Sequence, residues 1–185
     1  MKKVLSSSTM LLPVPAVLVT VADKEGKDNI VTLAWVGTVN TEPPMISISV
    51  RASRHSHSML EETGEFVVNL PSSNMLRELD LCGILSGREE DKFSLCGFKR
   101  LPASKVKVPL IDRCPVNIEC KVQHKLSLGS HDIYIGEVLA VQVDEALLDH
   151  KGKVDLSQMR PVSFIAGEYV EMGRKLSRAG TTFKK

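Results

Sequence analysis

Short segments rich in β-branched residues recur along this sequence and carry most of its apolar side chains. In residues 45–51, for example, Ile46 and Ile48 alternate with Ser47 and Ser49. Alternation with a period of two is typical of a strand that buries one face and exposes the other. The pattern predicts strands over residues 14–21, 30–39, 45–51, 65–70, 116–126 and 133–143.

Helical patterns are few and short. We expect Ser56 to cap a helix that ends at Gly64, and Ser72 or Ser73 to cap a second one. Gly136 lies inside the last predicted strand, where a glycine indicates a bulge or a close approach of backbone. Residues 86–108 are polar and irregular, a length typical of a functional loop or a small insertion.

The predicted elements restrict the fold class. A chain of 185 residues has the length of one domain. Many strands with few, short helices favour a barrel or a sandwich with the helices packed outside. We therefore predict a mainly β fold and do not expect a doubly wound parallel sheet.

Charge is distributed unevenly along the chain. Residues 172–185 contain five Lys and Arg and no acid, whereas the rest has 19 Lys and Arg against 22 Asp and Glu. A nucleic-acid-binding protein usually has a basic body with interleaved aromatic residues. We therefore expect no nucleic-acid partner, and we interpret the chain as one domain, 1–171, followed by a basic tail, 172–185.

The distribution of apolar residues argues against a membrane protein. The longest apolar run, residues 30–39, is about half the length that a membrane span needs. No apolar stretch follows Lys2 and Lys3, so the start of the chain does not resemble a secretory signal. We expect a cytoplasmic protein without a membrane partner.

The cysteines do not form a recognisable motif. Cys82, Cys96, Cys114 and Cys120 include no close pair and no paired Cys/His spacing. Zinc sites and redox dithiols need such pairs. We therefore predict no metal site, and we expect reduced cysteines buried as small core residues.

One polar cluster stands out, because no phosphate-loop, dinucleotide-binding, serine-hydrolase or metalloprotease motif is present. Residues 51–58 combine two arginines, two histidines and three serines just before the first expected helix. Forked guanidinium donors, hydroxyls and the unpaired N–H groups of a helix end suit a phosphate group. The residues alone leave two interpretations open, a phosphate site and a solvated polar turn.

Three further residues each have a functional and an ordinary interpretation. Lys92 is either a second cation for an anionic ligand or part of a solvated charged segment. Trp35, the only tryptophan, lies near Gly37 and is either a core residue or the border of an aromatic ligand. His131, at the start of the last predicted strand, is either a turn residue or a catalyst.

Taken in chain order, several motifs resemble the flavin reductase-like proteins of the flavoredoxin type. They are PAVLVT at 15–20, NIVTLAWVG at 29–37, PPM at 43–45, RxxRHS at 51–56, EFVVN at 65–69, SG at 86–87, DKF at 91–93 and HDIYIGEV at 131–138. Each motif alone is loose. Together, in the same order over residues 10–170, they identify the chain as similar to this family.

This resemblance implies an FMN-binding split β-barrel, a Greek-key-like barrel with small flanking helices. It also implies a homodimer with the flavin near the subunit interface. Arg54 and Ser56 stand where related two-component reductases often have serine and threonine. This difference fits the flavoredoxin branch and leaves open whether FAD binds as well as FMN.

The resemblance also assigns cofactor-binding roles to residues of this sequence. Those that would border the isoalloxazine ring are Thr32, Ala34, Trp35 and Gly37. Those that would hold the FMN phosphate are Arg51, Arg54 and Ser56. Ser86 and Lys92 would approach the ribityl-phosphate or the ring, and Ser49 and His57 complete the candidate cofactor-binding set.

The function that the resemblance implies is an FMN-dependent oxidoreductase that passes electrons through its flavin. NAD(P)H or a redox protein would be the electron donor, and His131 would be the catalytic candidate, near the flavin or an incoming nicotinamide. One alternative is a non-enzymatic split-barrel module that binds another cofactor such as haem, with histidines as axial ligands. A second alternative is a structural dimer that has lost its ligand.

Overall fold

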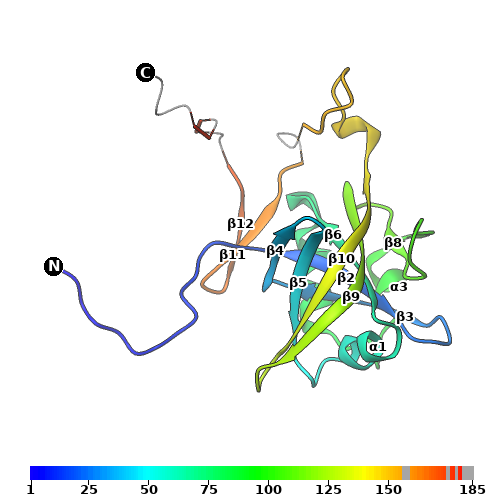
Figure 1. The fold of residues 1–185 in the computed structure, drawn as a ribbon, viewed down its shortest axis with the longest axis horizontal. Helices are drawn as coiled ribbons and strands as arrows, with labels where there is room; N and C mark the ends of the chain where they lie inside the picture. Colours follow the sequence, from blue (N-terminus) through cyan, green and yellow to red (C-terminus); the bar gives the residue numbers. More distant parts are fainter. Residues whose placement is uncertain (156–158, 174–175, 178, 181–185) are drawn as a thin grey trace.

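The computed structural model describes residues 1–155, 159–173, 176–177 and 179–180, and its body is one antiparallel sheet (Figure 1). The sheet has seven strands in the order β3-β2-β6-β9-β10-β5-β4. In that order they span Asp28–Leu33, Val17–Ala22, Glu65–Leu70, Val116–Ser127, Asp132–Val143, Pro44–Val50 and Val36–Thr41. The predicted mainly β class is confirmed.

The two edge strands of this sheet, β3 and β4, are consecutive in the chain and are joined by Ala34 and Trp35. The sheet therefore curls until its edges meet at this linker, and the result is a split barrel. The prediction of one strand over residues 30–39 is wrong, because the chain leaves one edge at Leu33 and enters the other at Val36. Strand-forming residues on both sides of the linker conceal the break.

The first predicted strand is also divided. β1 (Val14–Pro15) pairs with β11 (Val162–Ile165), whereas β2 begins at Val17. β11 pairs in turn with β12 (Glu168–Glu171), and these three strands form a small sheet beside the barrel that the sequence did not predict. Residues 1–13 extend away from the body of the molecule (Figure 1).

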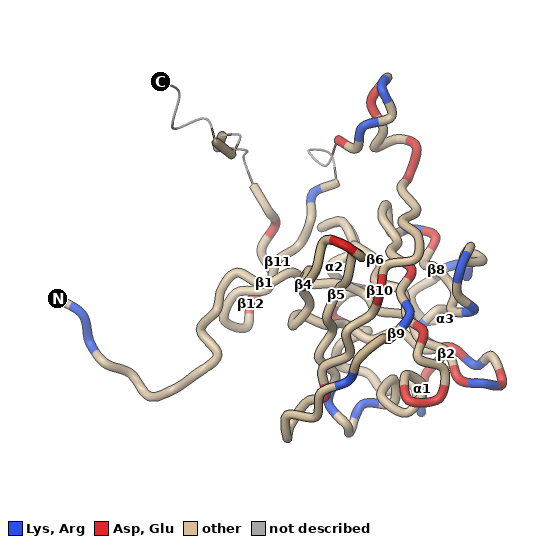
Figure 2. Tube along the Cα trace, in the orientation of Figure 1, with Lys and Arg blue, Asp and Glu red and all other residues tan. Residues whose placement is uncertain are grey.

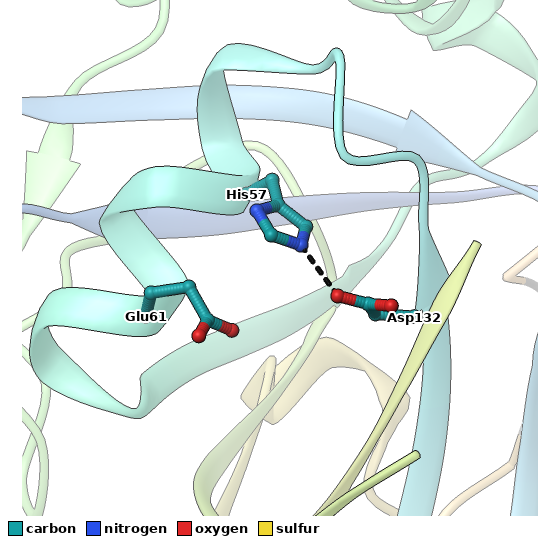
Figure 3. Close-up of side chains that lie close together, drawn as sticks. All are labelled: His57, Glu61 and Asp132. Atoms are coloured by element: carbon teal, nitrogen blue, oxygen red, sulfur yellow. Dashed lines mark hydrogen bonds and ion pairs between the residues drawn. The ribbon is translucent and has the colours of Figure 1, made fainter. Parts of the chain in front are cut away.

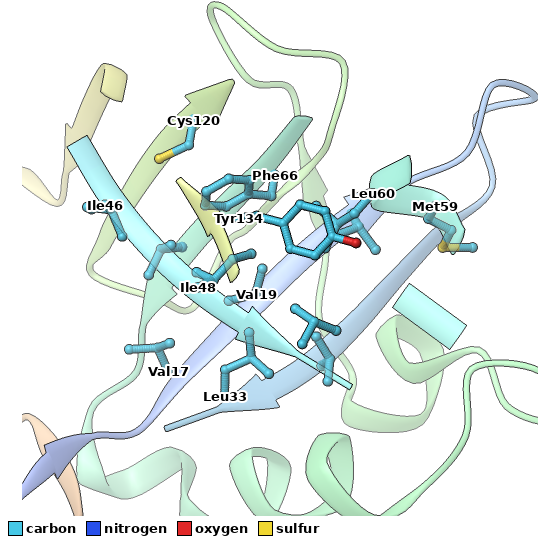
Figure 4. Packing of buried hydrophobic residues seen from close by; sticks show 14 residues of the cluster. Val17, Val19, Leu33, Ile46, Ile48, Met59, Leu60, Phe66, Cys120 and Tyr134 are labelled. Carbon is cyan, nitrogen blue, oxygen red and sulfur yellow. The ribbon is translucent and has the colours of Figure 1, made fainter. Parts of the chain in front are cut away.

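Apolar side chains fill the interior of the barrel (Figure 4). Phe66 and Ile48 are fully buried, and Gly136 lies against the Phe66 ring: a Cβ atom at this glycine would lie 2.7 Å from it. The pairing of β10 with β9 also shifts register between Ile135 and Gly136. The glycine therefore serves both a bulge and a close approach, as its position in the strand predicted.

Short helices lie outside the barrel. α1 (His55–Thr63) ends at Gly64, whose φ of 64° is left-handed, as predicted. The second predicted helix is a 3-10 turn, η1 (Ser73–Met75), followed by α2 (Leu76–Ile84). The polar segment 86–108 contains α3 (Lys92–Cys96) and β7 (Arg100–Leu101), which pairs with β8 (Leu110–Ile111). A last 3-10 turn is η2 (Glu145–Leu147).

A second apolar cluster packs α2 and α3 against the outer face of β2 and β3. It includes Leu79, Cys82, Phe93 and Cys96. All four cysteines are buried and free, as predicted. Of the described helices, none has the length and apolar character needed to cross a membrane. The five basic residues of the predicted tail lie outside the described residues.

Candidate functional site

A cavity of about 270 Å³ lies at the N-terminal end of α1. Four cationic side chains line it: Arg51, Arg54, Arg88 and Lys92. Its other lining residues are Asn29, Val31, Ser53, His55, Ser56, Ile84, Leu85, Ser86 and Gly87. No carboxylate is among them, so the described lining has a strong net positive charge and suits an anion.

The helix that points at this cavity begins two residues earlier than predicted. The N-cap of α1 is Arg54, whose side chain makes no capping hydrogen bond. Ser56 is therefore not the cap: it lies in the first turn, where its Oγ accepts a 2.8 Å hydrogen bond from Nδ2 of Asn29. The first N–H groups of a helix have no intrahelical partner, so this uncapped helix end adds donors for an anion.

His55 has an unsatisfied polar atom in this cavity's lining. Its Nε2 is buried and has no hydrogen-bond partner in the described part of the chain. Burial lowers the pKa of the imidazole, and the charge of Arg88 lowers that pKa further. A buried nitrogen without a partner is costly. Its position beside four cations fits a ligand that carries a phosphate and supplies the missing hydrogen bond.

Lys92 is a buried cation in the wall of the cavity. Its Nζ donates to the carbonyl oxygens of Ile30, at 2.7 Å, and Cys82, at 2.9 Å. Asp91 caps α3 by accepting hydrogen bonds from two backbone N–H groups of the first turn, and so fixes where Lys92 leaves the helix. Burial lowers the pKa of Lys92. The predicted second cation is therefore present. Its ammonium group has three N–H donors, and these two hydrogen bonds use two of them.

Gly87 also lines the cavity. A Cβ atom at Gly87 would lie 2.2 Å from Oδ1 of Asn29, so only glycine fits beside this amide. The close approach fixes Asn29, which in turn holds Ser56. Sequence reasoning did not place Asn29, His55 or Arg88 among the site residues, although His55 lies within the polar cluster at 51–58. The motifs at 29–37 and 51–56 contain Asn29 and His55, and they are the signal that could have found these two positions.

A second cavity, of about 340 Å³, continues from the first. Arg51 and Arg54 line both cavities, so the two meet at these arginines. The predicted residues that line the second cavity are Thr32, Ala34, Trp35, Ser49 and His131. Trp35 lies at the break between β3 and β4. It is 42% exposed there and borders this cavity instead of lying in the core.

His131 is held at the border of the second cavity by three neighbours. Nε of Arg51 donates to its Nε2 at 3.3 Å, so the ring proton lies on Nδ1, which is 2.9 Å from Oγ of Ser130. The Trp35 and His131 rings lie 4.4 Å apart. Burial lowers the pKa of His131, and the charge of Arg51 lowers it further. The lowered pKa favours the neutral imidazole, whose Nε2 accepts from Arg51 and orients it.

His57 lines neither cavity. Its Nε2 forms a 2.8 Å hydrogen bond with Asp132, and Glu61 lies close to both (Figure 3). The Lys125 ammonium group lies 2.9 Å from Glu61 and 3.0 Å from Asp132. Since the Lys125 ammonium group already pairs with both carboxylates, we assign no metal ion to the group. Its observed role is to join α1 to β9 and β10.

Gly37 also lies outside the second cavity. It is an exposed residue of β4 and borders a neighbouring hollow of about 740 Å³. That hollow shares Ala34, Trp35, Ser49 and Phe164 with the second cavity. The structure thus brings ten of the twelve predicted site residues to two adjoining cavities, and His57 and Gly37 lie outside them.

Comparison with known proteins agrees with this arrangement. A family model described as a flavin reductase like domain matches residues 9–171. The chain belongs to the flavin reductase-like family. This match and the split barrel confirm the resemblance that the sequence motifs indicated.

Two solved structures are similar to this family member along almost its whole length. A flavoredoxin of Desulfovibrio vulgaris (Miyazaki F) has a TM-score of 0.91 and 34% identity, and covers 98% of both chains. A flavoredoxin from Methanosarcina acetivorans has a TM-score of 0.90 and 31% identity, over 98% of this chain and 97% of that one. An uncharacterized protein of Archaeoglobus fulgidus is 33% identical over 75% of this chain and 78% of its own.

Proposed function

We propose that this protein is an FMN-binding oxidoreductase that passes electrons through its flavin. The observation that carries the proposal is the carboxylate-free cavity with four cations and the unsatisfied His55 Nε2 at the start of α1. This cavity adjoins a second one bordered by Trp35. FMN needs two adjoining sites of this kind, because its phosphate is joined to a planar ring system. The similarity to two flavoredoxins supports the same proposal.

In this proposal the cationic cavity binds the phosphate. Arg51 and Arg54 stand at the junction of the two cavities, where they orient the ligand between its phosphate and its ring. Backbone and side-chain atoms of Thr32, Ala34 and Trp35 border the ring. Bound FMN supplies the redox chemistry, and the protein sets its position and surroundings.

His131 is the proposed modulator of electron transfer. Its ring lies against Trp35 and its Nε2 is bonded to Arg51, so it lines the ring side of the site as a neutral group. We assign it to access by the electron donor and to the position of Arg51, and not to proton donation as an imidazolium. NAD(P)H or a redox protein remains the proposed donor.

The proposal includes a homodimer. Residues 1–13 extend from the body, and ahead of residue 8 they expose the large apolar side chains of Val4 and Leu5, as expected of a segment that a second copy covers. Sedimentation at micromolar concentration tests this part. A mass near that of one chain, 20.3 kDa, would contradict the dimer. A cytoplasmic location stays a prediction.

The visible absorption spectrum of the purified protein tests the function first. We expect the two bands of an oxidised flavin, retained through gel filtration, and bleaching on anaerobic addition of NADPH. Bands that persist with NADPH would indicate a carrier that takes electrons from another donor. A colourless protein that does not take up added FMN would refute the flavin proposal.

A matched pair of variants then tests the phosphate cavity. Arg54→Leu removes a lining cation, and we expect it to weaken FMN binding by about tenfold or more. Arg77→Leu removes an exposed arginine of α2 that does not line the cavity and serves as the control. Equal FMN affinity in the two variants would show that the phosphate lies elsewhere.

The haem-binding alternative has less support. Two of the histidines that it would use are engaged, because His57 Nε2 pairs with Asp132 and His131 Nε2 accepts from Arg51. The cationic cavity would also have no role in it. Absorption in the haem Soret region on addition of haem, without uptake of FMN, would favour this alternative.

A further inference from the structure

The hollow of about 740 Å³ beside the ring cavity has no role in the function proposed so far. Its walls come from residues 8–12 of the N-terminal segment, from the linker at Trp35, from β4 and β5, and from the turn between β11 and β12. It shares Trp35, Ser49 and Phe164 with the ring cavity, so the two open into each other. Its size is that of a small-molecule site.

The lining of this hollow is uncharged. No Asp, Glu, Lys, Arg or His is among its lining residues. Figure 2 shows the same contrast along the chain: beyond the basic residues at its start, the N-terminal segment has no charge until it enters the body. The four cations of the site line the other cavity. A ligand that binds in the hollow is therefore expected to be uncharged, since no group there could balance a charge.

Two aromatic side chains give the hollow a rigid boundary on the side of the ring cavity. Trp35 is 42% exposed and lies against His131, with ring centroids 4.4 Å apart. Phe164 packs edge to face on Tyr169, with ring centroids 5.4 Å apart. Both rings are thus held by a neighbouring ring, and both line the hollow. Such surfaces suit a planar, aromatic molecule.

One hydroxyl in this boundary lacks a partner. The side chain of Ser49 makes no hydrogen bond within the described part of the chain, although its backbone N–H donates to the carbonyl of Trp35 at 3.0 Å. By contrast, the neighbouring Ser47 donates to the carbonyl of Gly37. Ser49 can therefore donate to a carbonyl oxygen of a ligand that lies across the junction of the two cavities.

We propose that this hollow binds an uncharged, planar carbonyl compound of the quinone or aromatic ketone class. The ligand packs between the N-terminal segment and Trp35 and accepts a hydrogen bond from Ser49. That such a compound is a substrate of the flavin site rests on the proposed function. Its binding in the hollow does not itself require a flavin. A nicotinamide dinucleotide fits this hollow poorly, because its two phosphates would find no cation there.

Menadione, an uncharged naphthoquinone, is the probe that tests the proposal. Its affinity is measured by titration calorimetry with the protein as purified and with the protein saturated with FMN. Trp35 is the only tryptophan, so quenching of tryptophan fluorescence in the flavin-free protein reports binding beside this residue. Naphthoquinone sulfonate, which has the same rings and one negative charge, is the matched probe. We expect it to bind at least about tenfold more weakly.

Gly37 offers a clean way to alter the hollow. A Cβ atom at Gly37 would meet no atom within 4 Å, and its backbone is compatible with other residues. Gly37→Asp therefore places a charge in the hollow without disturbing the barrel, and we expect menadione to bind about tenfold more weakly. Gly37→Ala is the conservative control. Val39→Asp puts the same charge at an exposed position of β4 outside the lining, so it controls for charge on this strand.

The outcomes separate this proposal from the alternatives. Menadione binding that survives FMN loading and falls only in Gly37→Asp supports it. Loss of menadione binding on FMN loading overturns it, because the quinone then occupies the ring cavity. Equal affinity for the sulfonate, or no effect of Gly37→Asp, also overturns it. Absence of menadione binding overturns it as well, and if Gly37→Asp then halves the sedimentation mass, the hollow is an interface between copies. If FMN does not bind, the titration of the flavin-free protein with menadione still tests the proposal.

Discussion

Nζ of Lys92 lies 2.7 Å from the carbonyl oxygen of Ile30, so a buried ammonium group joins α3 to β3 across the wall of the cationic cavity. The same atom donates to the carbonyl of Cys82 at the end of α2. Lys92 therefore holds together three elements that surround the cavity. It also places a positive charge where the proposed phosphate binds.

Replacement of Lys92 by methionine is expected to affect stability and ligand binding together. Lys92→Met leaves two buried carbonyl groups without this donor, which should lower the free energy of unfolding by about 1–3 kcal/mol. Urea unfolding of the flavin-free protein measures this effect, and an FMN titration measures the loss of affinity. Lys99→Met, at an exposed lysine nearby, is the control. An unchanged unfolding midpoint in Lys92→Met would contradict the structural role.

Gly87 is expected to act on the cavity through Asn29. Gly87→Ala pushes the Asn29 amide away and should weaken FMN binding by about tenfold, because Asn29 then no longer holds Ser56. A double-mutant cycle tests this route. If the effect passes through Asn29, Gly87→Ala should cost little more in the Asn29→Ala background. Additive losses would mean that the two residues act independently.

His131→Ala is expected to slow reduction of the bound flavin by about tenfold while most of the FMN stays bound. The alanine frees Arg51 and removes the ring against Trp35, whereas the remaining cations still line the phosphate cavity. Stopped-flow reduction per bound flavin, with FMN affinity measured in parallel, separates the two effects. Loss of flavin with an unchanged rate per bound FMN would mean that His131 serves binding only.

The pH dependence of flavin reduction follows from the same residue. The folded protein lowers the pKa of His131 below its ordinary value of 6.5. The neutral ring therefore persists to a lower pH than in a free histidine, and the rate should stay level as the pH falls from 8 to about 6.5. His131→Gln removes the titration and keeps an acceptor for Arg51. A rate that titrates near 6.5 in the wild type but not in His131→Gln would contradict the lowered pKa.

Acid stability should depend on Asp132. The hydrogen bond from His57 and the one from Lys125 lower the pKa of this carboxyl from 3.8 to about 2. A carboxyl with a lowered pKa in the folded state stabilises the fold above its unfolded pKa, so its contribution should be complete above about pH 4 and lost as the pH falls through about 2. Asp132→Asn should flatten this part of the stability profile, measured by urea unfolding between these values. Glu25→Gln, at an exposed carboxylate, should leave its slope unchanged.

Gly136→Ala tests the close packing inside the barrel. Its new methyl group would lie 2.7 Å from the Phe66 ring and 3.1 Å from Cβ of Cys120, so we expect a loss of about 1–3 kcal/mol in the free energy of unfolding. Gly37→Ala is the matched control, because a methyl group there meets no atom within 4 Å. Equal unfolding midpoints for the two variants would show that the core can adjust around Phe66.

Several elements follow from local sequence alone. The strand predicted over residues 65–70 has the same bounds as β6, and Gly64 ends α1 in a left-handed conformation as predicted. In both cases the signal is local: apolar side chains with a period of two, and a glycine directly after a helical pattern. The ordered motifs also indicated the family, because they preserve the spacing of the residues that the fold brings together.

Other features were decided by the tertiary structure. Trp35 lies in a run of strand-forming residues, yet the chain changes there from one edge of the barrel to the other, because closing the sheet requires it. His131 meets Arg51, 80 positions earlier in the chain, only because β10 pairs with β5. The cationic cavity likewise combines Asn29 with residues 51–56 and 84–92. A sequence reports the preferences of neighbouring residues, whereas these contacts depend on which strands pair and how the sheet curls.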